Sequence, residues 1–374
     1  MILILVISAV IRIIFTPITS SGDYNLYLLP WVEEYRKLGV VRGLSTTIGD
    51  YYVPYNLIMA LTAALPWPPY VMISLSSCVA DYVGAFFLYK IALLILDDKN
   101  QGNETGKAKI IAVSILFLPC VVLNSSYWKQ CDAVYTCFMI IALYMLLKEK
   151  YFLMFFFYSI SFCFKLQAIF MLPFLLIIYM VKKKYSLFHF FMVPLMYLLI
   201  GIPSVIMQKG IRATYGVYFH QTNEWHKMSV NFPNIYKFGL GEYDSMSKYA
   251  ILITIVIFII ATLYCYYYRK GFDRYNTVAL CAWSIWTCCM FLPSMHERYD
   301  YAAILLVTVW ALSSGCAKNI WIAIAMNFCA MMSYSNYLFD TNIDILFIAI
   351  IYCVAYFAAT YIMAMNLSKQ HKEY

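Results

Sequence analysis

Residues 249–268 read YAILITIVIFIIATLYCYYY, an unbroken apolar run without a charged side chain. A helix needs about 17–25 mainly apolar residues to cross the hydrocarbon core of a bilayer, so this run has the length of one span. The strands of a membrane β-barrel are shorter, about 10 residues, and alternate between apolar and polar positions. The run therefore predicts a membrane-spanning α-helix.

Eleven further runs resemble this one, although several are shorter. They are 1–18, 69–96, 109–124, 131–147, 151–164, 166–181, 187–206, 276–292, 301–314, 319–333 and 343–364. Hydrophobic residues make up 63% of the chain and charged residues only 12%, about half the charged share of a soluble domain. We therefore expect an all-α polytopic membrane protein with about twelve transmembrane helices in a single domain, residues 1–374, and membrane lipid around it.

The chain has a net charge of +8, and its basic residues are unevenly distributed among the predicted turns. Lysine and arginine are concentrated in one set of turns, among them 107–109, 148–150, 182–184 and 269–274. Cytoplasmic loops carry such an excess of basic residues, so these turns and both termini are predicted to lie inside. The same distribution argues against nucleic acid as a partner.

Two long segments are then predicted to face outward, a first outer loop over 19–68 and a long outer loop over 207–248. In the first, Leu28, Val32, Tyr35 and Leu38 recur at helical spacing, which predicts an amphipathic helix over 24–38. The stretch 54–66 is apolar but short and ends at the sequence PWPP. Counting it as a span would place the lysine-rich turns outside, so we expect an interfacial helix there.

Polar residues gather at the predicted outer ends of the spans, where they suggest one outward-facing cavity. They are Asp23, residues 128–132 (WKQCD), Lys165 with Gln167, and residues 296–300 (HERYD). Charged groups inside hydrocarbon are costly and mark functional sites by default. Asp81, predicted near mid-membrane, is the exception, and we expect it to pair with a buried polar group such as Arg12.

Each of these residues also has a purely structural interpretation. Asp23 and Asp132 suit the N-terminal caps of the helices that follow them. The Lys165 ammonium can snorkel to the membrane surface. Glu297 and Arg298 can form a structural ion pair.

Four sequence motifs, taken together, resemble a known family. They are SGDY at 21–24, NSSYWKQCD at 124–132, FKLQA at 164–168 and MHERY at 295–299. In this order they are similar to bacterial membrane glycosyltransferases of the GT-C fold, in the group related to the second GPI mannosyltransferase. A weaker similarity reaches the eukaryotic dolichol-phosphate-glucose glucosyltransferases. The chain departs from the bacterial pattern at Lys129, where glycine is common, and at Asp300, where an aromatic residue is usual.

The resemblance implies a polyprenyl-phosphate sugar donor, a glycan or lipid-linked acceptor, inversion at the anomeric carbon, and neither a metal nor another cofactor. It places the catalytic acid residue at Asp23 and suggests a role in polysaccharide biosynthesis, without identifying the sugar. It also implies the bacterial cytoplasmic membrane, with the active site outward, or the endoplasmic reticulum in a eukaryote.

The expected chemistry gives each polar residue a role. A carboxylate such as that of Asp23 can act as the general base that takes the proton of the attacking hydroxyl. The leaving lipid phosphate requires cationic stabilisation, for which we predict Arg298, His296 and Lys165. Sugar or acceptor contacts are predicted for Trp128, Gln130, Asp132, Gln167 and Glu297.

Two other functions fit part of the sequence. A secondary transporter or lipid flippase would explain about twelve spans and Asp81, but we find no internal repeat of the kind such proteins carry. A membrane scaffold or assembly subunit would use the segment 207–248 to bind a partner.

Overall fold

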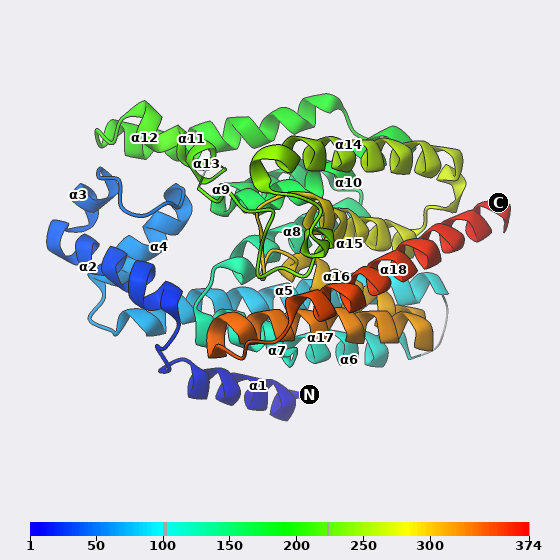
Figure 1. Ribbon diagram of the computed structural model, residues 1–374, viewed down its shortest axis with the longest axis horizontal. Coiled ribbons are helices and arrows are strands. Elements are labelled where there is room, and N and C mark those ends of the chain that lie inside the picture. The colour runs from blue at the N-terminus through cyan, green and yellow to red at the C-terminus, as the bar shows by residue number, and fades with distance from the viewer. Residues whose placement is uncertain (100–102, 223, 374) are drawn as a thin grey trace. The chain divides into compact units, whose positions relative to one another are not determined.

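The computed structural model describes residues 1–99, 103–222 and 224–373, and it is almost entirely helical (Figure 1). Two compact units are formed. The first combines residues 1–87, 116–168 and 187–225, and the second combines residues 88–115, 169–186 and 226–374. The predicted all-α architecture is confirmed.

The first unit contains most of the N-terminal half of the chain. Its helices are α1 (Ile2–Phe15), η1 (Tyr24–Leu28), α2 (Leu29–Leu38), α3 (Val40–Leu44), α4 (Val53–Ala64), α7 (Pro119–Val122), η2 (Leu123–Trp128), α8 (Asp132–Leu147), α9 (Tyr151–Phe164), η4 (Leu187–Phe191), α11 (Met192–Ile206), α12 (Ile211–Tyr215) and α13 (Val217–Gln221). Helices α5 (Pro69–Lys99) and η3 (Leu166–Met171) continue from the first unit into the second.

The second unit holds most of the C-terminal half. Its elements are α6 (Glu104–Leu116), α10 (Leu172–Lys182), β1 (Ser229–Val230), η5 (Ile235–Phe238), α14 (Tyr243–Tyr267), η6 (Arg269–Gly271), α15 (Arg274–Phe291), β2 (Met295–His296), α16 (Tyr301–Ser314), α17 (Ala317–Phe339) and α18 (Ile345–Glu373). Within the described ranges, the one sheet is the parallel pair of β1 and β2.

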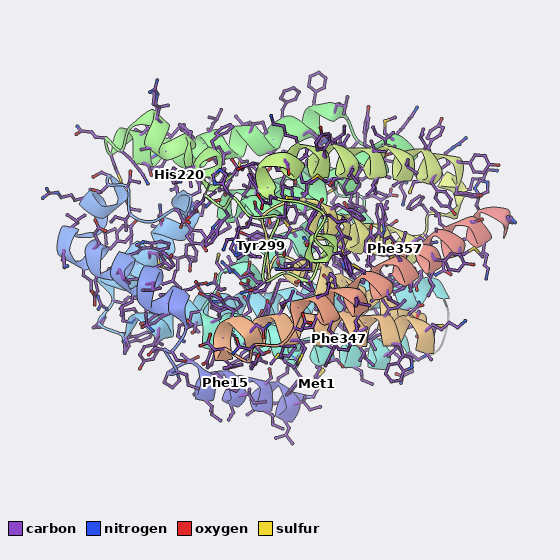
Figure 2. All side chains as sticks on the ribbon, in the orientation of Figure 1. Met1, Phe15, His220, Tyr299, Phe347 and Phe357 are labelled. Atoms are coloured by element: carbon purple, nitrogen blue, oxygen red, sulfur yellow. The ribbon has the colours of Figure 1, made fainter. Side chains whose placement is uncertain are left out.

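Within the part of the chain that the structure describes, four helices are long and apolar enough to cross a membrane: α5, the continuous η4–α11 helix, α14 and α18. A fifth span results if α6 and the α7–η2 segment, which meet at a bend of 54°, are counted as one. The runs predicted to be spans are mainly helical, but run 109–124 is broken between α6 and α7, and the count of twelve spans is not confirmed. Apolar side chains such as Phe347 and Phe357 on α18 are exposed, as expected where lipid is the solvent (Figure 2).

Helix α1, with Met1 and Phe15 labelled in Figure 2, buries only two side chains, Ser8 and Arg12. The Arg12 guanidinium lies 3.4 Å from the Asp81 carboxylate and also donates to the Ser8 hydroxyl. Both charges are buried, so the ion pair satisfies each of them inside the apolar region. The predicted pairing of Asp81 with Arg12 is confirmed.

Segment 19–68, predicted to be the first outer loop, is largely helical. Helices η1 and α2 form a continuous segment over the predicted range 24–38, and its apolar stripe is buried at Leu28, Val32 and Tyr35. Helix α4 occupies the predicted interfacial stretch and buries Tyr55 and Met59. The stripe and α4 pack in one hydrophobic cluster, which gives the start of the loop a firm support.

The segment predicted to be the long outer loop, 207–248, overlaps α14, because this helix begins at Tyr243 rather than at 249. Residues 207–225 belong to the first unit. There Tyr218 donates to the Phe162 carbonyl, and the Tyr52 ring stacks on Tyr197 at a centroid distance of 4.1 Å. These aromatic contacts join segments 19–68 and 207–225 to α9 and α11.

Candidate active site

Asp23 precedes η1, and its carboxylate is bonded to a distant part of the chain. Its Oδ2 accepts hydrogen bonds from Nε1 of Trp128, at 2.9 Å, and from Nε2 of Gln130, at 2.6 Å. The side chain makes no capping hydrogen bond to η1, and the Tyr24 amide instead donates to Ser21 Oγ. The capping interpretation of Asp23 is therefore wrong.

The donors to Asp23 are fixed by the loop that carries them. Trp128 ends the π-helix η2, and both it and Gln130 are buried. The backbone amide of Gln130 donates to the backbone carbonyl of Asn124, and the Ser77 hydroxyl on α5 donates to the backbone carbonyl of Gln130 at 2.6 Å. These two hydrogen bonds fix the backbone of Gln130, and with it the side-chain amide that donates to Asp23.

Both sides of this contact involve π-helical turns, since η1 follows Asp23 and η2 contains Trp128. A π-helical turn holds one residue more than an α-helical turn, and such turns occur often at functional sites. Hydropathy gives no indication of the extra residue, so the sequence predicted helices here but not their π-helical form.

A second carboxylate lies at the end of the same loop. Asp132 begins α8, and its Oδ1 accepts a hydrogen bond from the Lys165 ammonium at 2.5 Å while its Oδ2 accepts one from Asn124 at 3.1 Å. Both charged side chains are buried, and the ammonium also lies 5.7 Å from the centre of the Tyr135 ring. Lys165 therefore pairs with Asp132 instead of snorkelling, and Asn124 links this pair to the backbone of Gln130.

Gln167 lies close in sequence to that ion pair, on the 3-10 helix η3. Its side chain is half-buried, and its buried amide oxygen has no hydrogen-bond partner among the described residues. Its predicted contact with the sugar or acceptor stays a prediction.

The remaining predicted residues belong to the second unit. His296 lies on β2, which pairs with β1 through Ser229–Met295 and Val230–His296. Segment 229–231 thus holds the backbone of the histidine motif, an arrangement that no sequence pattern indicated.

Ion pairing orders the residues after His296. Arg298 donates to Glu297 Oε1 at 3.1 Å, so the predicted Glu297–Arg298 ion pair is confirmed. Its guanidinium lies 5.9 Å from the centre of the Tyr299 ring, and the centre of that ring lies 5.0 Å from the centre of the His296 ring. Asp300 precedes α16 and accepts a hydrogen bond from the Tyr352 hydroxyl at 2.6 Å.

The first unit therefore brings together five of the predicted site residues: Asp23, Trp128, Gln130, Asp132 and Lys165. Their catalytic and ligand-binding roles stay predictions. Asn124 was part of a recognised motif but was not predicted as a site residue, because its role depends on contacts formed only in the fold.

Comparison with known proteins gives the fold. No family model and no curated protein matches this sequence. Among solved structures, the crystal structure of ArnT from Cupriavidus metallidurans in the apo state is similar, with a TM-score of 0.54 and 12% sequence identity. The match covers 99% of this chain and 76% of that chain. The chain thus has the GT-C glycosyltransferase fold that ArnT represents, and it is an integral multi-pass membrane protein.

Proposed function

We propose that this protein is a membrane glycosyltransferase that transfers a sugar from a polyprenyl-phosphate carrier to a hydroxyl of a glycan or lipid-linked acceptor. The GT-C fold shared with ArnT supports the class of enzyme. The observation that carries the proposal is the pair of hydrogen bonds that Trp128 and Gln130 donate to Asp23.

These two bonds suit Asp23 to act as the general base. Both donors approach the same oxygen, Oδ2, from a loop more than 100 residues away in the sequence. They fix the orientation of the carboxylate before any substrate is bound, and such preorganisation is what a group needs for proton transfer.

The proposed reaction inverts the anomeric carbon of the donor sugar. Asp23 takes the proton of the acceptor hydroxyl, whose oxygen forms the new bond to that carbon. The bond from the carbon to the phosphate oxygen breaks, and the polyprenyl phosphate leaves with its electron pair. Protonated Asp23 then releases its proton to water.

For the leaving phosphate we propose Arg298 and His296. A guanidinium has five N–H donors in a planar fork, which matches the oxygens of a phosphate. Its partial exposure, 14% of the side chain, is also suited to an anionic ligand. Lys165 is the weaker candidate for this role, because the same ammonium neutralises Asp132 at 2.5 Å.

Several finer features belong to the same proposal. They are an outward-facing active site in the bacterial cytoplasmic membrane, kinship with the mannosyltransferase-like group, and a role in polysaccharide biosynthesis. The motifs and the distribution of basic turns support them. Asp81, which favoured a transporter, is accounted for by its ion pair with Arg12.

Sugar transfer in lipid nanodiscs tests the proposal. The purified protein is supplied with a panel of polyprenyl-phosphate sugars and acceptors prepared from cells, and Asp23→Asn is compared with wild type. Asp244→Asn, at an exposed position on α14, is the matched control. We expect transfer by wild type and the control, and a loss of about 100-fold or more in Asp23→Asn, since general-base catalysis contributes about 10²–10⁴-fold.

Other outcomes separate the parts of the proposal. Equal activity in Asp23→Asn would keep the enzyme class and remove Asp23 as base. If wild type shows neither transfer nor binding of any donor in the panel, the glycosyltransferase assignment itself fails.

A further inference from the structure

Lys129 is a fully buried cation whose contacts lie in the first unit. Its ammonium donates to the carbonyl of Ile18 at 2.5 Å, to that of Tyr127 at 2.9 Å and to that of Ser126 at 3.3 Å. An ammonium has three N–H donors, so each has one acceptor here. The Tyr24 ring, 5.4 Å from the ammonium, adds a cation–π contact.

These contacts connect the two segments that form the Asp23 site. Ser126 and Tyr127 lie in η2, just before Trp128, whereas Ile18 and Tyr24 flank the start of the first outer loop. The ammonium therefore ties the backbone before Asp23 to the loop that supplies the hydrogen-bond donors of Asp23.

Three consecutive side chains thus reach the same segment. Trp128 and Gln130 donate to the Asp23 carboxylate, and Lys129 between them donates to Ile18. Successive side chains diverge by about 100° on a regular α-helix and alternate on a strand. The chain departs from both, because Lys129 adopts the left-handed conformation with φ 65° and ψ 35°.

That conformation favours glycine and is strained for lysine. Glycine would satisfy the turn without strain but would leave the Ile18 carbonyl without this donor. The strained lysine therefore supplies a contact that glycine lacks.

We propose that Lys129 is a positioning residue, which holds segment 18–24 against loop 126–130 so that the Asp23 carboxylate keeps its two donors. This inference deepens the proposed function and rests on Asp23 as the base. Lys129 acts through Asp23 rather than on the substrate, so its loss should lower kcat with little change in KM.

The test compares three variants in nanodiscs. Lys129→Met removes the charge and keeps the strain, Lys129→Gly removes both, and Lys148→Met removes an exposed lysine as the matched control. Transfer kinetics are combined with hydrogen exchange of the backbone amides in residues 18–28 and 124–130, a readout that does not depend on activity.

We expect kcat to fall about 10- to 100-fold in both Lys129 variants, the effect of a small misplacement of a catalytic group. The backbone amides of residues 18–28 should exchange faster than in wild type in both Lys129 variants. Their exchange rates should be unchanged in Lys148→Met. The inference is overturned if exchange in 18–28 matches wild type in Lys129→Met, or if Lys129→Gly restores full activity, since strain and not the ammonium would then matter. If wild type neither transfers sugar nor binds any donor, the proposed function fails, and the exchange data still decide whether Lys129 holds the segment.

Discussion

Nε2 of Gln130 lies 2.6 Å from Oδ2 of Asp23, although 107 positions separate the two residues in the sequence. Trp128 donates to the same oxygen at 2.9 Å. The orientation of this carboxylate is therefore set by a loop between two other helices, and the geometry can be tested one donor at a time.

Trp128→Phe keeps an aromatic ring in the buried position but removes the indole N–H. A hydrogen bond to a charged group is worth about 1.5–3 kcal/mol, so we expect kcat to fall by at least about 10-fold while the protein stays folded. Transfer kinetics measure the effect, and Trp67→Phe, at an exposed position, is the control. Unchanged kcat would mean that Gln130 alone orients Asp23.

The Asp132–Lys165 pair is predicted to be structural to a large extent. Lys165→Met leaves a buried carboxylate without its cation, which costs about 3–5 kcal/mol of stability. Asp132→Asn combined with Lys165→Met should recover much of that loss, because no unpaired charge remains. Thermal unfolding in detergent measures both proteins.

A donor-binding role for Lys165 predicts a different result for the double variant. Its stability would recover, but its affinity for the polyprenyl-phosphate sugar would stay low. If the stable double variant binds the polyprenyl-phosphate sugar with wild-type affinity, Lys165 does not contribute to the phosphate site.

Lys129 should make stability depend on pH above neutrality. Burial lowers the pKa of its ammonium from 10.5 to about 8. Between these two values the unfolded chain binds more protons than the folded one, so the stability that Lys129 contributes rises with pH across this window and is constant below it. We expect the unfolding free energy of wild type, relative to Lys129→Met, to increase from pH 8 to 10.5. If the difference in unfolding free energy between wild type and Lys129→Met does not change with pH, the ammonium is exposed to water.

In the second unit, the Tyr352 hydroxyl is predicted to stabilise the turn after the histidine motif. It donates to Asp300, whose side chain is fully buried, at 2.6 Å. Tyr352→Phe should lower stability by about 1–3 kcal/mol, because the carboxylate loses a hydrogen-bond donor. Chemical unfolding measures the change, and Tyr361→Phe, exposed on the same helix, should leave stability unaltered.

Helices were predictable from the sequence because their signal is local. The run 249–268 and the apolar stripe of Leu28, Val32 and Tyr35 show length and periodicity within a short window, and both lie on helices. The number of spans was not predictable from the sequence. Several apolar helices are too short to cross a bilayer unaided, and their role depends on how they pack.

The partners of the site residues depend on contacts that the sequence does not encode locally. Asp23 had the spacing of a helix cap, but the fold supplies donors more than 100 residues away. Lys165 had the place of a snorkelling lysine, yet Asp132 lies within reach only after α8 and α9 pack. Arg12 and Asp81 were paired correctly because an apolar surrounding leaves a buried charge few alternatives.

The π-helical turns η1 and η2 have a consequence for how this protein tolerates change over evolution. Each turn accommodates one residue beyond α-helical geometry, so losing that residue would leave an intact helix. Everything beyond the deletion would nevertheless rotate by about 100°, the angle between successive residues of an α-helix. A deletion of a single codon in either turn would therefore separate Asp23 from its donors. Evolution must therefore preserve the length of these turns as well as the identity of the residues in them.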